Sequence, residues 1–154
     1  MDFFEGFFTW LGRTALAAIF VLAAIHHYKE FDGETGFKQK IVDAGVVKLA
    51  DKAYAHPQNP AIVAWGALGF MVVGGVLVAL GYKARFGALL LLVFVGLATY
   101  FFHNPFAIAD ERDRIKETIQ FLQHVAIAGG LCLILARGAG RWSMDAAAWD
   151  DEEF

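Results

Sequence analysis

Charge is missing from the two longest apolar runs of this sequence. No Asp, Glu, Lys or Arg lies between Ala61 and Tyr82, and none lies between Phe86 and Phe102. Over the whole chain only 19% of residues are charged and 58% are apolar, and the mean hydropathy is +0.49. An ordinary soluble domain of 154 residues has no use for several such runs, so these values argue against that class.

Cysteine and basic charge are also scarce. The single cysteine, Cys132, excludes a disulfide within the chain and a cysteine-based metal site, and we expect it to be a small buried apolar residue. Lys and Arg number 13 against 16 Asp and Glu, and the net charge of −3 argues against nucleic acid as a partner. The N-terminus, MDFFEGFF, is acidic and aromatic where a cleavable signal is basic, so we expect the first apolar run to be retained.

Apolar runs of membrane-spanning length are what the sequence does contain. Each central run has roughly 17–22 residues, and at about 1.5 Å per helical residue it crosses about 30 Å of hydrocarbon. Backbone groups in lipid must hydrogen-bond internally, so the runs are helical, and the short turn around Lys83 and Arg85 makes them an antiparallel hairpin. With one further run on each side, the sequence predicts an all-α integral membrane four-helix antiparallel bundle. It forms a single domain, residues 1–154, with spans at about 8–28, 61–82, 86–103 and 115–136.

The remaining segments have weaker patterns. Residues 36–55 alternate apolar and charged residues at near-helical spacing, which predicts an amphipathic helix on the membrane surface. Residues 143–154 form an acidic tail. Gly74 and Gly75 let neighbouring helices approach closely, so the second span is expected at the centre of the bundle. Arg13, near the start of the first span, has two open interpretations: a side chain that reaches the headgroups, or an inward-facing cation that pairs with another span or a ligand.

Histidines and glutamines are the candidate ligand-binding residues. His26 and His27 end the first span, His103 ends the third, and His124 lies about two turns into the fourth, so an antiparallel bundle places all of them toward one membrane face. They could form hydrogen bonds between helices, contact a quinone or a lipid, or ligate haem or a metal. No HxxxH or ExxH spacing supports the metal, and no catalytic residue set is visible. The candidate contact residues for quinone or lipid are His26, His27, His103, Gln120, Gln123 and His124.

Aromatic residues gather at both ends of the chain. Such residues prefer the headgroup level of a membrane, and those outside any evident core can also bind a partner protein. The candidate partner-binding residues are Phe3, Phe4, Phe7, Phe8, Trp10, Trp149 and Phe154.

Three segments resemble the DoxX-like membrane protein family. They read GRTALAAIFVLAAIHHYKEFDG in the first span, VVGGVLVALGYKARFGALLLL around the hairpin, and QHVAIAGGLCLILARGAGRWSMD at the exit of the last span. The ends of the first and last spans also resemble the plant lesion-inducer-related branch. The resemblance implies a four-helix membrane bundle with both termini cytoplasmic. Some members are subunits of quinol oxidases or of thiosulfate–quinone oxidoreductase. The family often has an acidic residue early in the second span, and Met71 stands there in this chain.

Two functions are consistent with these observations. The first is a non-catalytic accessory subunit that packs against a larger energy-transducing complex, respiratory or photosynthetic, in the bacterial cytoplasmic membrane or alternatively in a mitochondrial inner or other organellar membrane. Its partners would be membrane lipid and other membrane subunits. The second is the membrane component of a quinone-linked oxidoreductase, with a quinone near the histidines. A small-solute transporter is disfavoured because the second and third spans lack intramembrane charge.

Overall fold

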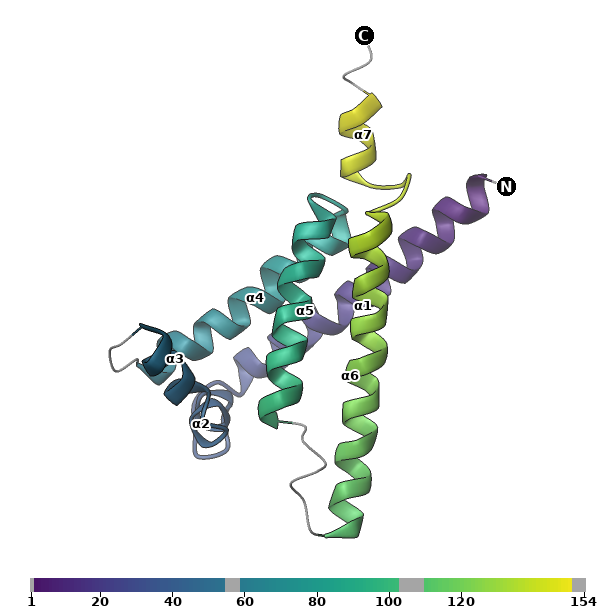
Figure 1. Cartoon of the computed structure of the whole chain (residues 1–154). Coiled ribbons are helices and arrows are strands. Elements are labelled where there is room, and N and C mark those ends of the chain that lie inside the picture. The colour runs from purple at the N-terminus through teal and green to yellow at the C-terminus, as the bar shows by residue number, and fades with distance from the viewer. Residues whose placement is uncertain (1, 55–58, 103–109, 151–154) are drawn as a thin grey trace.

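The computed structural model describes residues 2–54, 59–102 and 110–150, and within these ranges the chain is helical with no strand. Four of the helices, α1, α4, α5 and α6, are long and apolar enough to cross a membrane (Figure 1). The predicted all-α membrane fold is therefore confirmed. In order, the helices are α1 (Asp2–Lys29), α2 (Phe37–Asp43), α3 (Val46–Tyr54), α4 (Pro60–Leu80), α5 (Ala84–Phe102), α6 (Glu111–Arg137) and α7 (Met144–Asp150).

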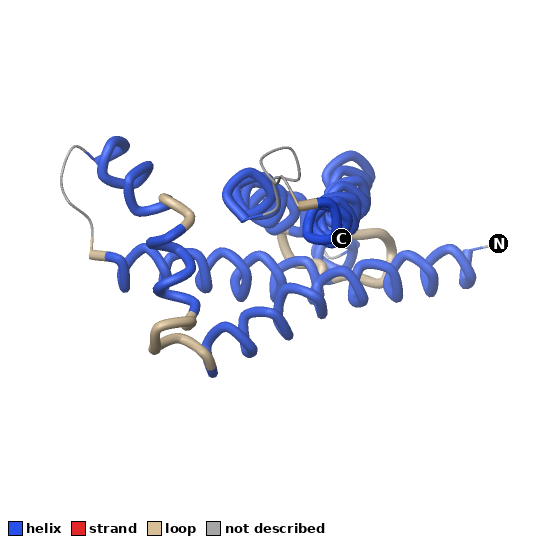
Figure 2. The backbone as a smooth tube through the Cα atoms, turned by 90° about the horizontal axis from the view of Figure 1, so that it is seen from below, coloured by secondary structure: helices blue, strands red, loops and turns tan. Residues whose placement is uncertain are grey.

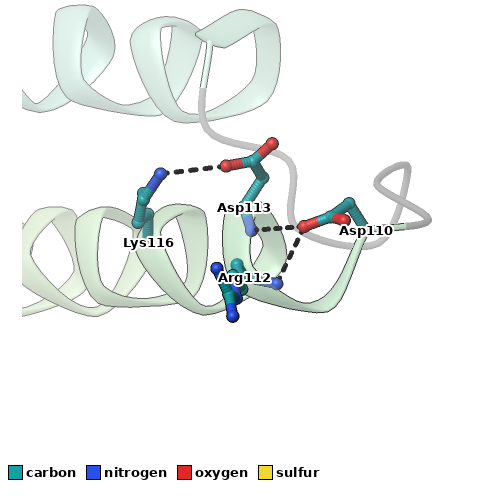
Figure 3. Close-up of polar contacts among 4 residues, drawn as sticks. All are labelled: Asp110, Arg112, Asp113 and Lys116. Carbon is teal, nitrogen blue, oxygen red and sulfur yellow. Dashed lines mark hydrogen bonds and ion pairs between the residues drawn. The ribbon is translucent and has the colours of Figure 1, made fainter.

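Helices α1 and α6 begin earlier than the apolar pattern indicates. Helix α1 starts at Asp2, so the aromatic N-terminus is part of the helix. Helix α6 starts at Glu111 because the Asp110 carboxylate accepts hydrogen bonds from the backbone N–H groups of Arg112 and Asp113, at 2.9 and 3.2 Å (Figure 3). Lys116 then contacts Asp113 at 3.0 Å. Local polar contacts, rather than apolar periodicity, therefore set this boundary.

Helix α4 lies at the centre of the spans, as its glycines predict. It packs against α1 on one side and α5 on the other, and α6 packs against α5 (Figures 1 and 2). A Cβ at Gly74 would lie 2.8 Å from the side chain of Leu91 in α5, and one at Gly75 would lie 3.0 Å from Val21 in α1. The two adjacent glycines therefore allow close packing of α4 against both α5 and α1. Met71, where the family pattern has an acid, is 2% exposed and belongs to this core.

The segment predicted as one amphipathic helix over residues 36–55 is two helices, so that prediction is wrong in its detail. Helix α2 ends at Asp43, and the chain turns at Gly45, whose φ of 79° is in the left-handed region that glycine favours. Phe37 and Ile41 of α2 are buried, and α2 packs against α4. The turn therefore lets the apolar face of α2 cover the end of the α1–α4 pair.

One smaller prediction, that Cys132 is buried, also differs from the structure. Cys132 is exposed on α6 rather than buried, because the buried residues of this helix near it are Leu131 and Ile134. Within the acidic tail, residues 144–150 form α7. The remaining residues of that tail, 151–154, lie outside the described part of the chain.

Candidate functional site

Arg13 is a buried cation inside the first span. Its side chain is 3% exposed, and its guanidinium donates hydrogen bonds to two backbone carbonyls beyond the end of α6. One acceptor is Ala139, and the other is Trp142 at 2.8 Å. The side chain of Arg13 therefore faces inward, toward the turn that follows α6.

The turn that follows α6 is pressed closely against α1. Gly138 and Gly140 have φ angles of 81° and 79°, so two left-handed residues fold the chain back over the helix end. A Cβ at Gly140 would lie 2.6 Å from the Cγ2 atom of Thr9. This close approach holds the carbonyl of Ala139 within reach of Arg13.

Asp145 joins the same turn to the α4–α5 hairpin. Its carboxylate accepts hydrogen bonds from the backbone N–H groups of Lys83 and Ala84, at 2.7 and 3.0 Å, at the start of α5. Its own N–H donates to the carbonyl of Gly81 at 2.9 Å. A negative group at a helix N-terminus satisfies free N–H groups and complements the helix dipole. The Gly-x-Gly-Arg-x-Ser-x-Asp exit thus closes one end of the four spans: its backbone binds Arg13 of α1, and its Asp145, in α7, caps the start of α5.

A basic cavity of about 780 Å³ opens beside this closure. Its cationic walls are Lys83 from the turn, Arg85 from α5 and Arg137 from α6, and Asp145 also lines it. A second cavity of about 260 Å³ lies between α1 and α6, and Arg137 lines both. None of the residues predicted from the sequence to bind a ligand lines this cavity. The available signal was the set of basic residues that follow the ends of the spans.

Of the histidines expected in one cluster, His26 and His27 lie beside each other, with ring centroids 5.7 Å apart, and His124 contacts a different residue. The ring of His27 stacks on Phe37 of α2, with centroids 4.3 Å apart, and His26 lies 3.5 Å from Glu30. His124 Nδ1 lies 2.8 Å from the hydroxyl of Thr99, so it links α6 to α5. Figure 1 shows the C-terminal end of α1 diverging from α6.

The other predicted ligand residues are two glutamines and one histidine. Gln120 and Gln123 are exposed on α6, and His103 lies outside the described residues. Within the described ranges, no group of three His, Cys, Asp or Glu residues could hold a metal ion. A quinone or lipid contact at the histidines and glutamines stays a prediction.

The aromatic residues of the N-terminus differ in their contacts within the chain. Phe3 and Phe7 pack edge-on against Trp142, with ring centroids 5.2 and 6.3 Å apart. Phe3 is nevertheless largely exposed, as are Phe4, Phe8 and Trp10. The side chain of Trp149 and the whole of Phe154 lie outside the described part of the chain. Partner binding by these aromatic residues stays a prediction.

Comparisons with known proteins agree with this architecture. The DoxX family profile matches residues 8–104, and the SURF4 family profile matches residues 62–149. The ER-derived vesicles protein ERV29 of Saccharomyces cerevisiae is 34% identical over 86 residues, which are 53% of this chain and 26% of that protein. The chain thus spans about a quarter of the length of this curated relative. No solved structure is significantly similar to the present chain. The chain is an integral membrane protein that belongs to the DoxX family and shares its second half with the SURF4 family.

Proposed function

We propose that this chain is a non-catalytic membrane subunit that binds another membrane protein through the outer face of α6. The supporting observation is how little of α6 is covered. Only 11% of its most apolar window is buried inside the chain, against 22% for α1, 33% for α4 and 22% for α5. Helix α6 packs mainly on α5, so its opposite face is open.

The exposed residues of that face are spaced like the contact seam of a helix pair. They recur every three or four positions, which is the spacing of a and d positions where two helices pack. Small residues lie at the middle of the seam and let a second backbone approach closely. We name this surface the α6 outer seam, and it consists of Ile115, Ile119, Leu122, Ala126, Gly129 and Leu133.

Two adjacent glycines separate the inner and outer contacts of α6. A Cβ at Gly130 would lie 2.7 Å from Leu16 of α1, so Gly130 serves the packing within the chain. A Cβ at Gly129 would meet nothing within 4 Å, so this glycine is not required by any described internal contact. A glycine in a helix costs about 1 kcal/mol relative to alanine, and a close-packed partner helix would offset that cost.

The kind of partner is a finer proposal. The family resemblance favours a respiratory or photosynthetic energy-transducing complex. The name of the yeast relative instead points to vesicles derived from the endoplasmic reticulum, and a partner in such a membrane is the alternative. The α6 outer seam fits either partner, because its chemistry is that of any close-packed pair of membrane helices.

Co-purification tests both whether the α6 outer seam binds a partner and which kind of partner it is. The full chain is extracted from its native membrane in gentle detergent, and co-migrating proteins are identified by mass spectrometry. We expect Gly129→Leu to lose the partner and Gly66→Leu, an open glycine on α4, to keep it. Equal recovery of the partner by both variants would refute the α6 seam. The identity of the recovered protein decides between the two kinds of partner.

A further inference from the structure

The basic cavity between the α4–α5 turn, α6 and α7 has no assigned role. We name it the hairpin pocket; it has three cationic side chains, from Lys83, Arg85 and Arg137, around a volume of about 780 Å³. Lys83 and Arg85 are close in the sequence, and the fold brings Arg137 from the end of α6 beside them. Like charges are brought together at an energetic cost that a bound anion relieves.

Asp145, the acidic residue in the wall of the pocket, already accepts hydrogen bonds from the backbone. Both carboxylate oxygens of Asp145 accept backbone hydrogen bonds, from Lys83 and Ala84. Arg137 makes no hydrogen bond or ion pair with any described residue, and the described hydrogen bond of Arg85, to the carbonyl of Ala136, is 3.4 Å long. Strong bonds from a guanidinium to an anion are shorter, about 2.7–2.9 Å, so these two arginines retain most of their capacity to bind one.

The pocket lies at the depth where phospholipid headgroups lie. It opens where α4 ends at Leu80, α5 begins at Ala84 and α6 ends at Arg137, and these are the limits of three apolar spans. Basic pockets between membrane helices at this level bind anionic lipid headgroups. The groove of about 260 Å³ between α1 and α6 borders on the same arginine and has Leu16, Leu133 and Ile134 in its walls.

We propose that the hairpin pocket binds the phosphate of an anionic phospholipid, with an acyl chain of that lipid along the α1–α6 groove. Arg85 and Arg137 hold the phosphate oxygens, and Lys83 adds a third positive charge. Free inorganic phosphate has the same oxygen chemistry, but it would make no use of the apolar groove. The site differs in place from the histidines, and Leu133 in the wall of the groove is the one residue that it shares with the α6 outer seam.

Native mass spectrometry of the purified full chain tests this binding. The protein is reconstituted with equal amounts of phosphatidylglycerol and phosphatidylcholine, and the lipid that stays bound is counted. We expect the wild type to retain phosphatidylglycerol preferentially. A basic residue near an anionic surface contributes about 1 kcal/mol, so Arg137→Gln is expected to lower this preference roughly fivefold. Arg137→Lys keeps the charge and is expected to retain most of the preference.

The control is Arg112→Gln, because Arg112 is exposed at the opposite end of α6. Equal retention of both lipids by the wild type, or an equal loss of preference in Arg112→Gln, would overturn the proposal. Displacement of the lipid by millimolar inorganic phosphate would show that the pocket selects a small anion, which would overturn the lipid as its ligand. Arg137 is exposed, and an unchanged circular dichroism spectrum of its variants confirms that the fold is intact.

Discussion

The guanidinium of Arg13 donates a hydrogen bond to the carbonyl of Ala139, a residue 126 positions later in the chain. A cation within a membrane span is costly unless it is paired or reaches water. Ala139 and Trp142 follow the end of α6, where the negative end of the helix dipole also favours a cation. Two nitrogens of Arg13, Nη1 and Nη2, therefore bond the turn after α6, while its buried Nε has no partner among the described residues. These two bonds join the first and last spans at one end.

Removal of Arg13 is expected to weaken the whole fold. Arg13→Gln shortens the side chain and removes its charge, which leaves the carbonyls of Ala139 and Trp142 without their donor. The expected loss in the free energy of unfolding is about 3 kcal/mol. Denaturant unfolding of the protein in detergent measures this loss. The control, Arg114→Gln on an exposed part of α6, should change stability by less than about 0.5 kcal/mol, and similar losses for both variants would contradict the pairing.

Asp145 is expected to protect the first turn of α5. Asp145→Ala removes both acceptors for the N–H groups of Lys83 and Ala84, at a cost of about 1 kcal/mol. Asp145→Asn keeps one acceptor oxygen, so its effect should be smaller. Hydrogen exchange followed by mass spectrometry should show faster exchange at residues 83–84 in Asp145→Ala. Unchanged exchange there, with faster exchange only in α7, would contradict the capping role.

The glycines of α4 offer a matched test of helix packing. Gly74→Ala places a Cβ 2.8 Å from Leu91, and overpacking of this kind costs about 1–3 kcal/mol. Gly69→Ala on the same helix meets nothing within 4 Å, and the better helix propensity of alanine should stabilise it by up to about 1 kcal/mol. Thermal unfolding in detergent compares the two variants. Equal shifts in the unfolding temperature would contradict the close α4–α5 contact.

The spans could be predicted from sequence because lipid imposes one requirement on every residue of a span. A run without charge must be helical there, whatever its neighbours are. The central place of α4 was also predictable, since Gly74 and Gly75 have no other evident purpose in an apolar helix. The exit motif pointed to the right segment, but only the fold shows that Asp145 caps α5.

The direction of each side chain could not be predicted in the same way. Antiparallel spans place His26, His27 and His124 toward one face, but sequence says nothing of the angle between α1 and α6. In the structure the C-terminal end of α1 diverges from α6, which no sequence pattern shows (Figure 1). The direction of the Arg13 side chain was open for the same reason, because the sequence does not show which face of α1 packs against the turn after α6. Gly45 interrupts the helical pattern of residues 36–55, but the sequence does not show whether the helix continues through this glycine or turns at it.

His124 is expected to act first as a link between α5 and α6. The Thr99 hydroxyl donates its one proton to the carbonyl of Val95 at 2.7 Å, so it accepts from Nδ1 of His124. A neutral imidazole protonated at Nδ1 has no proton on Nε2 to donate to a quinone carbonyl. A double-mutant cycle of Thr99→Val and His124→Leu should therefore show a coupling of about 0.6 kcal/mol, while the quinone content of the purified protein stays unchanged. Loss of quinone in the His124 variant, together with zero coupling, would instead support the quinone-linked alternative.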